Sequence, residues 1–300
     1  MPTGEESKGF SEPVTEPVTE PVTDPVTERF YAIQVAYDGS RYAGWQIQPN
    51  GLAIQQVLAE GIAKVLGHRV TIQGSGRTDA GVHAYGQVVA FSTPVWKHAA
   101  NNLVRAINMH LPRDIAVLEC RRVVDGFDPI RSAVSKTYRY TIRNSRVPDP
   151  LRYGYHWWIP RELDIQAMRL GACRLTGTLD FKAFETLGSN RKTSVRTVRK
   201  LEVISVDAIA GSEIVIEIQA NGFLYNMVRN ITGALVEIGK GRFGPEWLDE
   251  LLEARVRVTH SQTAPARGLC LMSVEYPASI YIDPLDDLGE NAEGSLRDGA

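Results

Sequence analysis

The segment 74–84 holds the residues of this chain that are best suited to chemistry, Arg77 and Asp79, among three glycines. Glycine permits tight or left-handed backbone, so a loop of this composition can be shaped around a ligand. Arg77 and Asp79 are two residues apart and share a face wherever the chain is extended, which predicts a site that uses a carboxylate and a guanidinium together. The alternative interpretation is a turn aspartate that caps its own backbone beside a solvated arginine.

Other motifs accompany this segment in a fixed order along the chain. The loop reads Gly-Arg-Thr-Asp-Ala-Gly-Val-His-Ala over 76–84 and is followed by Gly86-Gln87-Val88 and Phe91. The further motifs are Tyr37-Asp38-Gly39 to Gly44-Trp45-Gln46, Lys136-Thr137-Tyr138-Arg139-Tyr140, Asp180-Phe181 with Phe184, the run 222–230, and Ala264-Pro265-Ala266 to Gly268-Leu269 with Leu271. Together they closely resemble the bacterial tRNA pseudouridine synthase A family, over about residues 31–276.

The resemblance implies an isomerase, an intramolecular transferase that converts uridine to pseudouridine at positions 38, 39 and 40 of the tRNA anticodon stem-loop. It implies tRNA as the partner and a homodimer as the assembly. The reaction breaks the N1–C1′ bond of uridine, turns the uracil and rejoins it through C5. Nothing is oxidised or hydrolysed, so neither a cofactor nor a metal is expected.

The resemblance assigns the essential carboxylate to Asp79, which could act as a nucleophile toward the sugar or the base, or as a base on the sugar. It assigns to Tyr138 the ring that stacks on the detached uracil and keeps it from escaping. Lys136, Tyr138 and Tyr140 share one face of a predicted strand, so a ring presented to a cleft is consistent with the sequence. Without the resemblance, a core or cross-strand aromatic would be the simpler interpretation of Tyr138.

Arg229 lies in a predicted helix but falls off its apolar stripe. The resemblance makes Arg229 the residue that holds Asp79 ionised and aimed, since a nearby guanidinium lowers a carboxyl pKa and opposes the rise that burial causes. It makes Arg77 a contact to RNA as the target base is flipped out. The alternative for Arg229 is a surface arginine on an amphipathic helix, whose stripe consists of Leu224, Val228, Ile231, Leu235 and Ile238.

Basic residues gather in the segment 191–200, interleaved with serine and threonine. Arg191, Lys192 and Arg196, followed by Arg199 and Lys200, predict a mobile loop that grips RNA phosphates, although a solvated hydrophilic loop has the same composition. The charge of the whole chain fits a polyanionic partner, because the net charge of −2 divides into −5 over 1–29, +8 over 30–282 and −5 over 283–300.

The domain organisation follows from composition and pattern. A repeated Glu-Pro-Val-Thr unit predicts a disordered arm over 1–29, and an acidic, apolar-poor stretch predicts a disordered tail over 283–300. An N-terminal half over 30–125 carries the Asp79 loop, and a C-terminal half covers 126–282. Strands are expected near 31–37, 70–73, 87–91, 115–123, 134–143, 198–206, 213–219 and 269–276, and helices near 54–65, 99–110, 223–238 and after Pro245.

These elements predict an α+β fold with strands too close together for crossover helices. The resemblance adds two pseudo-symmetric α/β halves, with mainly antiparallel sheets, around a basic central cleft. The chain has no basic-then-apolar leader pattern and no apolar stretch of about 20 residues, so a cytoplasmic protein without a membrane segment is expected. The three separated cysteines are expected to be buried as small hydrophobic residues.

Three other functions are weighed against this interpretation. The run Gly239-Lys240-Gly241-Arg242-Phe243-Gly244 satisfies the dinucleotide pattern, but it follows a predicted helix rather than a strand. A non-catalytic RNA-binding module would not need Asp79, Tyr138 and Arg229, all of which are present. A metalloenzyme is disfavoured because the histidines at 68, 83, 98, 110, 156 and 260 show no closely paired spacing and the cysteines form no CxxC pair.

Overall fold

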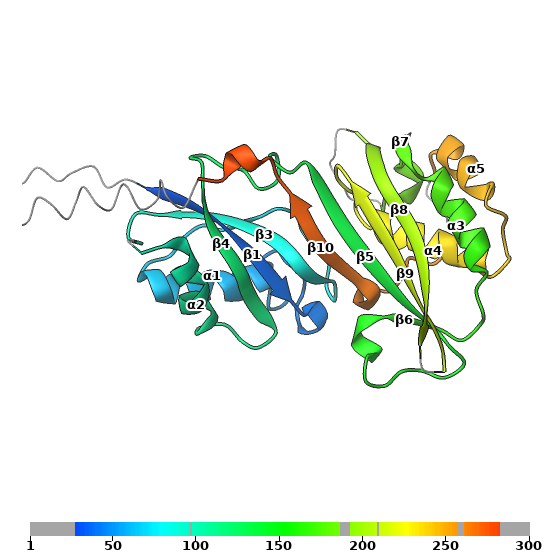
Figure 1. The fold of residues 1–300 in the computed structure, drawn as a ribbon, viewed down its shortest axis with the longest axis horizontal. Helices are drawn as coiled ribbons and strands as arrows, with labels where there is room; N and C mark the ends of the chain where they lie inside the picture. Colours follow the sequence, from blue (N-terminus) through cyan, green and yellow to red (C-terminus); the bar gives the residue numbers. More distant parts are fainter. Residues whose placement is uncertain (1–27, 97, 187–192, 209, 257–260, 283–300) are drawn as a thin grey trace, which may run out of the picture.

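One mixed sheet of ten strands extends through the molecule (Figure 1). The structure is a computed structural model that describes residues 28–96, 98–186, 193–208, 210–256 and 261–282. Its strands are β1 (Arg29–Tyr37), β2 (Gln73–Gly74), β3 (His83–Thr93), β4 (Ile115–Val123), β5 (Ser135–Asn144), β6 (Trp157–Ile159), β7 (Gly177–Asp180), β8 (Val195–Ala208), β9 (Gly211–Ala220) and β10 (Leu269–Glu275).

The strands are ordered β4-β1-β3-β10-β5-β9-β8-β7, with β2 paired to β3 and β6 paired to β5. Only the β10–β3 and β6–β5 pairs are parallel among the described strands. The sheet is therefore mainly antiparallel, and the predicted α+β class is confirmed. One difference from the expectation concerns continuity, because a single sheet joins the two halves through β10.

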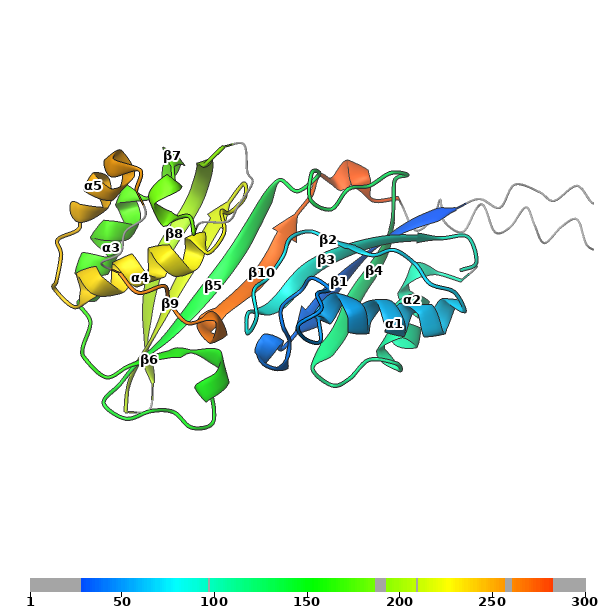
Figure 2. The same ribbon diagram turned by 180° about the vertical axis from the view of Figure 1, so that it is seen from behind.

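Five α-helices are present in the described part of the chain: α1 (Ile54–Leu66), α2 (Ala100–Asn108), α3 (Ile165–Arg174), α4 (Met227–Gly239) and α5 (Trp247–Ala254). In the N-terminal half, alternate residues of β1 point into a core that α1 and α2 cover, as the two-residue period of a strand requires. In the C-terminal half, α3 and α4 cover a second core over β5, β8 and β9. Figure 2 shows α1, α2 and α4 in front of the sheet.

Strand β10 shows why both sets of helices lie on one face. Leu269 belongs to the C-terminal core and Leu271 to the N-terminal core, and residues two apart on a strand point to the same face. The opposite face carries no α-helix among the described elements. Near one end of the sheet, Phe127 and Ile280 cover this opposite face and pack on Ala32 and Val88.

The structure confirms most of the expected elements and corrects several boundaries. The strand expected at 70–73 is reduced to β2, and α4 begins only at Met227 because Asn226 has a left-handed φ of 59°. Elements β6, α3 and β7 were not predicted. The buried positions of α3 are Met168, Gly171 and Ala172, so its apolar stripe is weak, although Asp164 caps the helix by accepting from the N–H of Ala167.

The glycine run at 239–244 connects the end of α4 to α5 and follows no strand, which removes the dinucleotide interpretation. The cysteine prediction holds for Cys120, which is buried, but is wrong for Cys173, which is exposed on α3; Cys270 is half-buried. No helix within the described ranges combines the length and the apolarity needed to cross a membrane. The predicted arm and tail lie outside the described residues, except for Glu28 and Arg29 at the end of the arm.

Candidate active site

The loop 75–82 connects β2 to β3 and presents Asp79 at the joint between the two halves. The N–H of Val82 donates to the carbonyl oxygen of Asp79 at 3.1 Å, closing a turn in which Gly81 has a φ of 79°. Glycine is favoured at this position because a side chain would clash with the backbone in the left-handed conformation. The Asp79 side chain is 32% exposed, whereas Arg77 points to solvent.

Strand β3 holds the first part of the loop through Gln87, whose side chain is completely buried. Its Nε2 donates to the carbonyl oxygen of Gly76 at 2.8 Å, and its Oε1 accepts from Oγ of Ser75 at 2.6 Å. The backbone N–H of Ser75 donates to the carbonyl oxygen of Val88 at 2.7 Å. These bonds satisfy buried polar groups and fix the loop to a strand of the sheet.

The motif at 37–46 supports the loop from the other side. The hydroxyls of Tyr37 and Thr78 are 2.8 Å apart, and the N–H of Trp45 donates to the carbonyl oxygen of Thr78 at 3.0 Å. Gly44 has a φ of 98°, and a Cβ there would lie 2.7 Å from that same carbonyl oxygen. Sequence reasoning assigned no role to this motif beyond the resemblance; its role in the structure is to position Thr78, the neighbour of Asp79.

Strand β5 brings two residues of the C-terminal half to the same place. Nζ of Lys136 donates to the carbonyl oxygen of Ser75 at 2.5 Å, a contact that sequence reasoning did not predict. Tyr138, two residues further along, is half-buried and packs against both hydrophobic cores. Its ring meets the ring of Phe223 edge-on, with centroids 5.0 Å apart. Across the sheet Tyr138 is in register with Leu271 of β10, which is in register with Ala84 of β3.

Arg229 reaches Asp79 from the first turn of α4. Its Nη1 lies 3.3 Å from Oδ2 of Asp79, and its side chain is only 17% exposed. Nε donates to the carbonyl oxygen of Ala264 at 2.7 Å, and Nη1 donates to Oδ1 of Asn226 at 2.8 Å. The guanidinium is therefore held by two fixed acceptors and presented to the carboxylate, as the resemblance implied.

Two opposing effects set the charge state of Asp79. Burial raises its pKa by disfavouring the ionised form, and the charge and hydrogen bond of Arg229 lower it. Burial prevails, and the pKa of Asp79 lies above the ordinary value for an aspartate. The expectation that Arg229 favours the ionised carboxylate is correct in direction, but Arg229 only partly offsets the effect of burial.

The residues predicted to grip RNA phosphates are placed differently from the expectation. Arg191 and Lys192 lie outside the described residues. Arg196 is part of β8 rather than of a loop, is 8% exposed, and donates from Nη1 to the carbonyl oxygens of Thr193 and Val195. Its contact with RNA stays a prediction. In the part of the chain that the structure covers, no three histidine, cysteine or acidic side chains gather into a group that could hold a metal.

Comparison with known proteins agrees with this geometry. The family model described as tRNA pseudouridine synthase matches residues 33–125 and 172–277. A relative from Pelobacter propionicus named tRNA pseudouridine synthase A is 45% identical over 248 residues, which are 83% of this chain and 100% of the relative. Relatives of the same name from Myxococcus xanthus and Exiguobacterium sibiricum are 42% and 40% identical, over 81% and 84% of this chain and 91% and 98% of their own lengths. This chain belongs to the tRNA pseudouridine synthase family.

Proposed function

We propose that this protein isomerises uridine to pseudouridine at positions 38, 39 and 40 of the tRNA anticodon stem-loop, with Asp79 as the essential carboxylate. The observation that carries the proposal is the pairing of Asp79 with Arg229 at 3.3 Å. Both residues lie within the segments that match the family model, 33–125 and 172–277. The loop presents the carboxylate and α4 pairs it with a guanidinium, an arrangement that a residue that only caps a turn does not need.

The isomerisation of uridine requires few protein groups, and the Asp79–Arg229 pair supplies the main ones. The N1–C1′ bond breaks, the C5–C1′ bond forms, and the proton displaced from C5 is balanced by one gained at N1. An ionised Asp79 can act on the sugar or the base as a nucleophile, or on the sugar as a base. Arg229 keeps the carboxylate aimed and partly compensates for its burial.

Tyr138 and Arg77 complete the proposed site. Tyr138 lies on the strand face that also carries Lys136, which contacts the Asp79 loop, and its ring could stack on the uracil while the base turns in its own plane. Arg77 is exposed two residues before Asp79, where it could contact RNA as the target nucleotide leaves the stack. We assign phosphate contacts in the basic central cleft to Arg191, Lys192 and Arg196.

Assembly, location and division into halves belong to the same proposal. We expect a homodimer, which sedimentation equilibrium would test, and a cytoplasmic location, which cell fractionation would test. We also propose the division into halves at 30–125 and 126–282. The presence of two hydrophobic cores supports it, although β10 supplies a residue to each core and Val82 belongs to the second.

The decisive experiment compares the wild-type protein with Asp79→Asn on an anticodon stem-loop RNA carrying uridine at positions 38, 39 and 40. Asparagine keeps the size of the side chain and removes the anionic oxygen, so we expect no pseudouridine and nearly unchanged affinity at fixed salt. Replacing each uridine by cytidine in turn identifies the positions that are modified. Near wild-type turnover by Asp79→Asn would refute the role of Asp79. RNA binding without any turnover by the wild-type protein would favour the non-catalytic module.

A further inference from the structure

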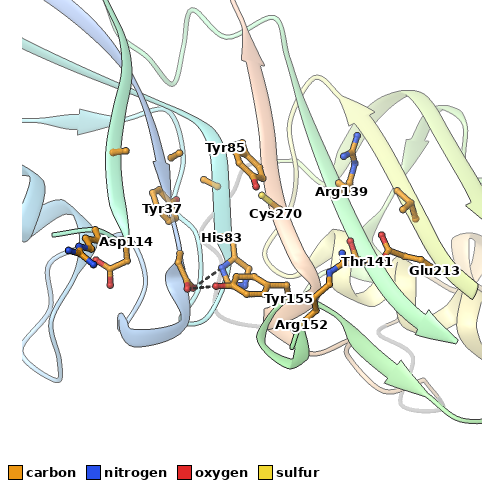
Figure 3. Close-up of a pocket in the computed structure, with 16 residues that line it drawn as sticks. Tyr37, His83, Tyr85, Asp114, Arg139, Thr141, Arg152, Tyr155, Glu213 and Cys270 are labelled. Carbon is orange, nitrogen blue, oxygen red and sulfur yellow. Dashed lines mark hydrogen bonds and ion pairs between the residues drawn. The ribbon is translucent and has the colours of Figure 1, made fainter. Parts of the chain in front are cut away.

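A hollow of about 600 Å³ opens on the side of the sheet opposite the α-helices, and Figure 3 shows the residues that line it. Asp79, Tyr138 and Arg229 do not line it. Its wall includes His83, the first residue of β3 and the fourth after Asp79, together with Asp38 and Tyr155. His83 is buried, and the mechanism proposed above gives it no task.

The His83 ring contacts both halves of the molecule. On the N-terminal side, Nδ1 lies 3.2 Å from the backbone nitrogen of Gly39. On the C-terminal side, Nε2 lies 3.2 Å from the carbonyl oxygen of Gly154 and 3.1 Å from that of Arg267. Because two carbonyl oxygens face Nε2, this nitrogen must carry a hydrogen and donate it.

The bond to the C-terminal half does not depend on whether the ring is charged. A neutral ring with its hydrogen on Nε2 accepts from the N–H of Gly39 at Nδ1. A doubly protonated ring instead pairs with Oδ1 of Asp38, which lies 3.1 Å from Nδ1. In both states the Nε2 hydrogen stays directed at Gly154 and Arg267.

The two segments that His83 joins are the ones that place the catalytic pair. His83 directly follows Val82, whose N–H closes the turn at Asp79. Arg267 follows Ala264 by three residues, and the carbonyl oxygen of Ala264 anchors Nε of Arg229. Between them, Pro265 accepts from the hydroxyl of Tyr140 at 2.7 Å, so this stretch is held to β5 as well.

We propose that His83 is a positioning residue for the reaction: it ties the end of the Asp79 loop to the 264–268 segment, and so holds Asp79 and Arg229 in register across the joint between the halves. The inference rests on the proposed function. The parallel pairing of β3 with β10 spans the same joint but has only two residue pairs in register. Because this backbone pairing is short, the side-chain contacts of His83 contribute a large part of the connection between the two segments.

Three substitutions test the contacts of Nδ1 and of Nε2 separately. His83→Gln keeps a donor where Nε2 lies and can still reach the carbonyl oxygens of Gly154 and Arg267. His83→Asn keeps an acceptor near Nδ1 for Gly39 but is too short for the far carbonyls. His83→Phe keeps the ring packing on Tyr155, whose centroid is 5.1 Å away, and removes both polar contacts.

We expect His83→Phe and His83→Asn to lower kcat for pseudouridine formation by about 10-fold to 100-fold, with KM for the RNA little changed, and His83→Gln to retain most of it. Tyr155→Phe is the matched control. It removes only the hydroxyl that donates to Oδ2 of Asp38 at 2.8 Å, and should keep wild-type turnover. Equal turnover in all three His83 variants would overturn the proposal, as would a lower kcat for Gln than for Asn.

A measurement that needs no turnover accompanies these rates. In the same variants we would follow the titration of the Asp79 carboxyl by ¹³C NMR, and expect its midpoint to move to higher pH in His83→Phe and not in His83→Gln. An unchanged titration midpoint of Asp79 in both His83→Phe and His83→Gln would contradict the positioning role of His83. If the wild-type protein forms no pseudouridine, the proposed function fails while this comparison still decides the role of His83. Loss of the fold in all three variants would make His83 a stabilising residue only and overturn the proposal.

Discussion

The guanidinium of Arg229 lies 3.3 Å from the carboxylate of Asp79, although 150 residues separate them along the chain. One residue comes from a loop of the N-terminal half and the other from a helix of the C-terminal half. The ion pair therefore forms only when both halves are folded and joined through β10, and the proposed activity depends on that joint.

Replacing Arg229 with leucine should slow turnover far more than it weakens RNA binding. The substitution removes the positive charge that opposes burial, so the pKa of Asp79 should rise further. As the pH is lowered, activity should then fall off at a higher pH than in the wild type. Arg229→Lys keeps the charge and should shift the profile less. An unchanged rate and pH profile in the leucine variant would contradict the pairing.

Asp79→Asn should stabilise the fold at neutral pH. The pKa of Asp79 is raised in the folded protein, so ionisation costs folding free energy above that pKa and costs nothing below the ordinary pKa. Asparagine resembles the protonated acid, so the gain in thermal midpoint should be present at pH 7. It should be lost as the pH falls from the raised pKa of Asp79 to the ordinary pKa of an aspartate. Calorimetry across this range is the measurement, and a variant less stable than wild type at pH 7 would argue against it.

Gln87→Leu should destabilise the protein and loosen the Asp79 loop. The buried amide makes two hydrogen bonds to the loop, and their removal leaves the carbonyl oxygen of Gly76 without this donor, at a cost of about 1–3 kcal/mol. Urea unfolding measures the cost, and Gln87→Glu, which can still accept from Ser75, serves as the partial control. Wild-type stability and turnover in the leucine variant would show that the loop needs no such anchor.

Tyr138→Phe should retain most of the turnover, and Tyr138→Leu should lose it. Stacking on uracil needs an aromatic face, which phenylalanine keeps and leucine lacks. The edge contact with Phe223 contributes about 0.5–1.5 kcal/mol to stability, so thermal midpoints must be compared alongside the rates. Equal activity of the two variants would assign Tyr138 to core packing instead.

Charge reversal at Arg191 and Lys192 should weaken RNA binding and flatten its dependence on salt. For each phosphate that is no longer neutralised by a basic side chain, the slope of log affinity against log salt should become shallower by about one. Turnover at saturating RNA should remain near wild type, because neither residue is assigned to the chemistry. Arg196 is left unchanged in this test because it donates to the carbonyl oxygens of Thr193 and Val195, and its reversal would confound binding with folding. A salt slope equal to that of the wild type would remove these residues from the interface.

The identity of the candidate site and most of its frame could be predicted from the order of the amino acids. The run 76–84 singled out Asp79, and alternation or helical spacing predicted β1, β4, β5, β9, α1 and α2 closely, because local hydrophobic periods report directly on which side of an element is buried. The resemblance also selected Arg229 and Tyr138. Short elements such as β6 and β7, and α3 with its small buried residues, carry too little periodicity to be seen in this way.

How these residues meet became apparent from the folded molecule alone. The contacts of Gln87, Tyr37 and Lys136 to the loop cross between strands, and the contacts of His83 cross between the halves of the molecule, so no spacing along the chain could reveal them. The same holds for the charge of Asp79. The resemblance pointed to Arg229 as the residue that lowers its pKa, but the degree of burial, which prevails, depends on how both halves close around the carboxylate.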